Sequence, residues 1–61
     1  MTYSVMKRLI ENAVAKRTQG LWQKDEYEAY KEAQQRKLDV FYATGRLTEA
    51  QYEELTGLWV E

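Results

Sequence analysis

The carboxylates are the residues that could carry acid–base chemistry, because the chain contains no histidine and no cysteine. The candidates are two adjacent pairs and one single residue: Asp25-Glu26, Glu53-Glu54 and Asp39. Adjacent residues of a helix point about 100° apart, so neither pair easily brings two carboxylates to one substrate proton. A chain of 61 residues also has little room to enclose a pocket of about 300 Å³. The sequence therefore predicts no catalysis. The usual zinc and iron ligands are missing as well, so we expect no metal and no cofactor.

Basic pairs and aromatic side chains could instead contact nucleic acid. The basic pairs are Lys7-Arg8, Lys16-Arg17 and Arg36-Lys37, and the aromatic residues are Trp22, Tyr27, Tyr30, Phe41, Tyr42, Tyr52 and Trp59. The formal net charge is −1, whereas nucleic-acid-binding domains are normally strongly basic. The helical spacing of the aromatic residues favours a place in the core, where large rings supply much of the buried area. Nucleic-acid binding is therefore the weaker hypothesis.

Small size predicts that the chain gains stability from a partner. A chain this short buries only about 60% of the surface it exposes when unfolded, and without cysteine it forms no disulfide. The charge is also uneven: residues 1–20 hold four basic and one acidic residue, whereas residues 45–61 hold one basic and four acidic. This gradient favours a homo-oligomer, a dimer first of all, or a polar partner surface. No apolar run approaches the ~20 residues of a membrane helix, so we expect no membrane partner.

Three glycines divide the chain into three predicted helices. Apolar residues recur at three- and four-residue steps, which predicts helices over about 4–18, 24–44 and 49–57. Gly20, Gly45 and Gly57 are candidates for the left-handed residue that follows many helices. We therefore predict an all-α fold, a small helical bundle with short glycine-containing turns that forms a single domain over residues 1–61.

Two of these helices begin with similar capping chemistry. Thr48 and Gln51 have the spacing of a capping box, in which each side chain bonds the other residue's backbone N–H. Gln23 and Glu26 occupy the same positions 25 residues earlier, although glutamine is a weak N-cap. For the first helix, Thr2 or Ser4 is the predicted N-cap.

The middle helix carries the predicted interaction surface. Its members are an apolar stripe and the polar residues that interrupt it: Tyr27, Tyr30, Gln34, Lys37, Leu38 and Phe41. The stripe continues on both sides of the polar interruption, so we expect it to need more apolar surface than one chain supplies. Antiparallel pairing of two middle helices would cover both ends of the stripe.

The two turn regions resemble a family of short phage proteins. Gly20-Leu21-Trp22-Gln23-Lys24-Asp25-Glu26 and Gly45-Arg46-Leu47-Thr48-Glu49-Ala50-Gln51-Tyr52-Glu53-Glu54-Leu55-Thr56-Gly57 are similar to the motifs of the XkdX-like group, encoded among the tail genes of phages and prophages of Gram-positive bacteria. The match covers about half the chain, and the spacer between the motifs is longer here.

The resemblance implies a phage or prophage accessory protein, a small helical protein–protein interaction module in the host cytoplasm. The expected partner is a second copy, a phage structural protein or a host protein. Association with the virion stays open. The alternative is a small phage regulator that binds nucleic acid or inhibits a host protein.

Overall fold

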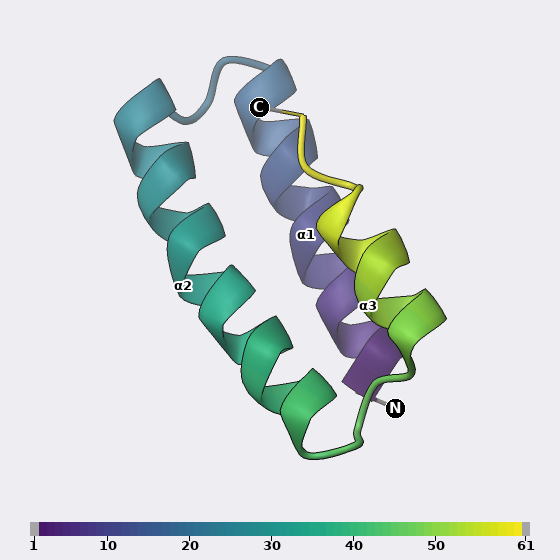
Figure 1. Ribbon diagram of the computed structural model, residues 1–61. Helices are drawn as coiled ribbons and strands as arrows, with labels where there is room; N and C mark the ends of the chain where they lie inside the picture. Colours follow the sequence, from purple (N-terminus) through teal and green to yellow (C-terminus); the bar gives the residue numbers. More distant parts are fainter. Residues whose placement is uncertain (1, 61) are drawn as a thin grey trace.

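Three α-helices make up the computed structural model of the chain, which describes residues 2–60 (Figure 1). The helices are α1 (Thr2–Thr18), α2 (Lys24–Ala43) and α3 (Glu49–Thr56). α1 and α2 run antiparallel, and α3 turns back along the same direction as α1 (Figure 1). The predicted all-α fold of three helices joined by short glycine-containing turns is confirmed.

The helix boundaries differ slightly from the prediction. α1 already includes Thr2, so Thr2 and Ser4 lie in its first turn and the predicted N-cap at either residue is wrong. α2 and α3 each end one residue before the predicted end, because Thr44 and Gly57 are their C-caps. Lys16 and Arg17 occupy the last turn of α1, where cations interact favourably with the helix dipole.

Two glycines end their helices in the predicted left-handed conformation. Gly20 has φ +80° and Gly45 has φ +79°. After α1, the N–H of Leu21 donates to the carbonyl of Lys16 at 2.9 Å, and the N–H of Gly20 donates to the carbonyl of Arg17 at 3.1 Å. This pair of bonds is the Schellman motif, which satisfies carbonyls that the end of a helix leaves unpaired. The turn around Gly45 is closed by the same pattern of bonds.

The left-handed conformation predicted for Gly57 is wrong. Gly57 has φ −80° and ψ −5°, in the right-handed helical region. Its N–H donates to the carbonyl of Glu53 at 3.0 Å, as it would in a continuing helix. Glycine is therefore not required here by backbone conformation, unlike at the two interhelical turns.

The capping box predicted for α3 is present. The hydroxyl of Thr48 accepts from the N–H of Gln51 at 3.1 Å, and Oε1 of Gln51 accepts from the N–H of Thr48 at 3.0 Å. At the start of α2, the N–H of Gln23 donates to Oε1 of Glu26 at 3.0 Å. The sequence therefore specifies locally where both helices begin.

The core lies where the three helices meet. It consists of buried apolar residues from every helix and from the second turn: Met6, Ile10, Ala13, Tyr27, Leu38, Leu47 and Leu55. The accessible surface is 4246 Å², close to the roughly 4,200 Å² typical of a folded monomer of this mass. The chain thus closes a core of its own, although at 34 × 16 × 16 Å it is elongated along the helices.

Candidate interaction surface

Half of the predicted interaction surface lies inside the chain. Tyr27 and Leu38 have no exposed area and Gln34 is only 6% exposed, so these three residues cannot contact a partner. They are seven and four residues apart, which places them on one side of α2, and that side faces the core. The prediction is therefore wrong for these three. Lys37, from the same set, is exposed.

The other two predicted residues, Tyr30 and Phe41, are half-buried and lie in opposite halves of α2. The rings of Tyr30 and Trp22 are 5.0 Å apart, and Nζ of Lys16 lies 5.0 Å from the Trp22 ring centre. Phe41 packs against the core, and the guanidinium of Arg46 lies 5.9 Å from its ring centre. Phe41 thus packs within the chain and has a cation over its ring, whereas Tyr30 packs against Trp22, and the cation there lies over Trp22.

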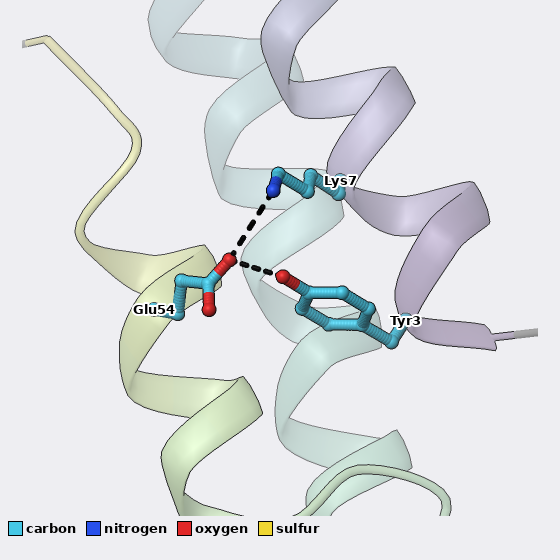
Figure 2. Close-up of polar contacts among 3 residues, drawn as sticks. All are labelled: Tyr3, Lys7 and Glu54. Carbon is cyan, nitrogen blue, oxygen red and sulfur yellow. Dashed lines mark hydrogen bonds and ion pairs between the residues drawn. The ribbon is translucent and has the colours of Figure 1, made fainter.

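A cluster of three polar residues links α3 to α1. Glu54 reaches from α3 toward α1, where its Oε2 accepts a hydrogen bond from the Tyr3 hydroxyl (Figure 2). Nζ of Lys7 lies 3.5 Å from the same oxygen. The bond from Tyr3 lowers the pKa of Glu54, and the same bond raises the pKa of Tyr3. The pKa of Lys7 is raised, chiefly by its interaction with Tyr3.

A second polar cluster links α3 to α2. The Tyr52 hydroxyl donates to Oδ1 of Asp39 at 2.5 Å, and this bond raises the pKa of Tyr52. Nε2 of Gln35 lies 3.3 Å from both Asp39 Oδ1 and the Tyr52 hydroxyl. The Tyr52 ring also stacks on Tyr42, with 4.8 Å between ring centres. The candidate acid–base residues Asp39 and Glu54 therefore each accept a hydrogen bond from a tyrosine hydroxyl, and each of these bonds joins two helices.

The segment after α3 is held against the beginning of α2. The rings of Trp59 and Tyr27 meet edge to face at 5.8 Å. The N–H of Val60 donates to the Tyr27 hydroxyl at 3.0 Å, which satisfies the one polar atom of this buried side chain. Nε1 of Trp59 is buried and has no hydrogen-bond partner. These contacts bring the C-terminal residues back to the end of the bundle where α1 ends (Figure 1).

That end of the bundle carries an apolar surface that the sequence did not predict. Leu21 is 67% exposed and Val60 is 55% exposed. Each follows by two residues a residue, Gln19 or Leu58, that lines an open, mostly apolar depression of about 380 Å³; the other lining residues are Glu11, Val14, Ala15 and Thr18. We call Leu21, Val60 and this depression the apolar end. Its parts come from both ends of the sequence, so no local pattern could have brought them together.

The basic pairs are partly engaged within the chain. Lys7 contacts Glu54, Lys16 lies over an aromatic ring, and Nη2 of Arg36 lies 3.7 Å from Oε1 of Glu32. The contact between Lys7 and Glu54 also joins the basic N-terminal helix to the acidic C-terminal one. Part of the charge gradient seen in the sequence is therefore compensated within one chain.

Comparison of this chain with protein-family models, with curated proteins and with solved structures gives no match. None of the three helices in residues 2–60 has the length and apolar character needed to cross a bilayer. Within the same residues, no group of three or more histidine, cysteine, aspartate or glutamate side chains is arranged to hold a metal ion.

Proposed function

We propose that this protein is a small helical interaction module that binds another protein through its apolar end. The observation that carries the proposal is the exposure of Leu21 and Val60, each two residues along the chain from a residue that lines an open, mostly apolar depression. Exposed apolar side chains are common singly, but a depression with apolar residues at its edge is typical of binding surfaces. Burial of the exposed part of both side chains by a partner would stabilise the complex by about 1–2 kcal/mol each.

The polar clusters support a role in contact rather than in catalysis. Glu54 and Asp39 accept hydrogen bonds from Tyr3 and Tyr52, and these bonds join α3 to the other two helices. Each carboxylate thereby stabilises the arrangement of helices that builds the apolar end. Catalytic carboxylates instead need a substrate site within hydrogen-bond reach.

The proposed setting is that of a phage or prophage accessory protein. The resemblance of the two glycine-containing turns to the XkdX-like group supports it, and the structure adds a physical reason for the shared residues. Gly45 takes the left-handed conformation and Thr48 caps α3, so these positions fix the turn between two helices. The proposed partner is a structural protein of the phage or a protein of its host, met in the host cytoplasm.

Affinity capture from cells in which the phage is induced tests this proposal. We expect the tagged protein to retain a specific partner, and the double variant Leu21→Glu/Val60→Glu to lose it, because a buried charge without a partner is unfavourable. Val5→Glu is the matched control: Val5 is 57% exposed but lies near the other end of α1. Retention of the partner by the double variant, or its equal loss in the control, would contradict a role for the apolar end.

A further inference from the structure

The outward side of α2 forms one continuous face that nothing in residues 2–60 covers. Between Asp25 and Lys37 its members are all exposed: Asp25, Glu26, Ala29, Ala33, Arg36 and Lys37; Val40, 56% exposed, continues the same stripe beyond them. At 3.6 residues per turn, these six positions fall within a stripe roughly 120° wide. The buried residues Tyr27, Gln34 and Leu38 lie on the opposite side of the helix. We call the six residues the outward face of α2.

The six residues of this face are spaced symmetrically about one central position, with acidic residues on one side of it and basic residues on the other. An acidic pair is followed after three residues by one alanine, after four more by another, and after three more by a basic pair. The centre of the pattern is Lys31. A second copy of α2 that runs in the opposite direction would therefore place Asp25 against Lys37, Glu26 against Arg36 and Ala29 against Ala33.

We propose that this face binds the same face of a second copy, with the two α2 helices antiparallel around a two-fold axis near Lys31. This proposal rests on the proposed function as an interaction module and names one of its partners. The two-fold axis repeats every contact, so the pair has four opposite-charge contacts and two contacts between alanines. A parallel pair would instead set like charges against each other, which is destabilising.

Side-chain size and present contacts suit this arrangement. Small alanines at the crossing point allow helix axes to approach to about 8 Å, the short end of the usual range. Arg36 now pairs with Glu32, but both side chains are about three-quarters exposed, at 77% and 73%. Exposed pairs of this kind contribute little, so Arg36 can exchange its partner at small cost. Glu26 caps α2 through Oε1, which leaves its second carboxylate oxygen to accept from the other copy.

The expected complex is weak. The face spans about 18 Å from Asp25 to Lys37 and is one helix wide. Such a contact buries well under the roughly 800 Å² per partner of a stable complex. We therefore expect folded monomers at low micromolar concentration and dimers as the concentration approaches millimolar. Added salt should weaken the association, because its specificity comes from exposed charges.

Thiol crosslinking tests the geometry directly, since the chain has no cysteine of its own. Ala29→Cys and Ala33→Cys are prepared separately, one of them labelled with ¹⁵N, and mixed in a glutathione redox buffer. We expect the mixed 29–33 disulfide to exceed clearly the half of all crosslinked product that random collision gives. The control is Ala50→Cys, an exposed alanine of α3, mixed with either variant. Random proportions, or a preference for 29–29 and 33–33 pairs, would overturn the proposal.

The second test reverses the charges at either end of the face. Light scattering at protein concentrations up to about 1 mM measures the mass of each variant. Arg36→Glu/Lys37→Glu makes the face acidic throughout, whereas Asp25→Lys/Glu26→Gln makes it largely basic and keeps a side chain that can cap α2. Each variant alone should stay monomeric, and an equal mixture should regain the mass of a dimer.

Either a wild type that is monomeric throughout, or a dimer unaffected by both variants, would refute the α2 pairing. Neither result bears on partner capture through Leu21 and Val60, so the two proposals fail separately. Unchanged helical circular dichroism in every variant shows that the fold is intact.

Discussion

Replacing the glycines one at a time by alanine separates backbone conformation from packing. A Cβ at Gly20 or Gly45 would meet no atom within 4 Å, so its whole effect comes from the positive φ. The left-handed conformation costs an alanine about 1–2 kcal/mol, and the reduced freedom of the unfolded chain returns about 0.5 kcal/mol. We expect each variant to lose about 1 kcal/mol of unfolding free energy.

Gly57→Ala is the internal control, and it should behave in the opposite way. Its φ of −80° suits alanine, and the new Cβ would lie 3.4 Å from the Glu53 carbonyl oxygen, an ordinary contact. The reduced freedom of the unfolded chain should therefore leave stability unchanged or raise it by up to about 0.5 kcal/mol.

Urea titrations followed by circular dichroism measure these differences. With a slope of about 1 kcal/mol per molar urea for so small a chain, Gly20→Ala and Gly45→Ala should each lower the midpoint by roughly 1 M. Equal losses at all three glycines, or no loss at Gly45, would refute the assignment of left-handed turns.

Three further substitutions test the helix cap and the two polar clusters. Thr48→Ala should cost about 1 kcal/mol in the same titration, whereas Thr2→Ala should cost far less, because Thr2 caps no helix. Tyr52→Phe should lower the melting temperature by removing the bond to Asp39, and more than Tyr42→Phe does; equal shifts would argue against that bond. The pKa of Glu54 is lowered by folding, so its contribution is present above the ordinary carboxyl pKa and lost as pH falls through the folded value. Glu54→Gln should therefore be less stable than the wild type at pH 7, and the difference should shrink as pH falls below the ordinary carboxyl pKa of about 4.3 and vanish below the lowered folded value; a difference independent of pH would contradict this.

Local sequence patterns predicted the helices well, because each pattern acts within one or two turns of the chain. Thr48 and Gln51 are three residues apart, and Gly45 lies two residues after the last residue of α2, so the boundaries of the second turn could be predicted without tertiary structure. Gly57 shows the limit of such patterns. A glycine permits the left-handed conformation but does not impose it, and here the chain continues in the right-handed region.

The surface could not be predicted in the same way, because it depends on contacts between distant residues. Tyr27 follows a helix start and could equally have faced solvent; its burial depends on Trp59 and Val60, more than thirty residues away. Tyr3 likewise donates a hydrogen bond to Glu54, which is 51 residues away in the sequence. The periodicity of apolar residues gives no indication of that bond. The helical stripe of α2 was identified correctly, but whether it faces the core or a partner is decided by the other two helices.

In the arrangement described above, one chain closes its own core and keeps its contact surfaces free for partners. Far-UV circular dichroism of the protein diluted to about 1 µM, far below the range of the proposed dimer, tests this most directly. We expect the same helical signal as at high concentration, and cooperative thermal unfolding. Loss of the helical signal on dilution would contradict it, because the core would then depend on a second chain.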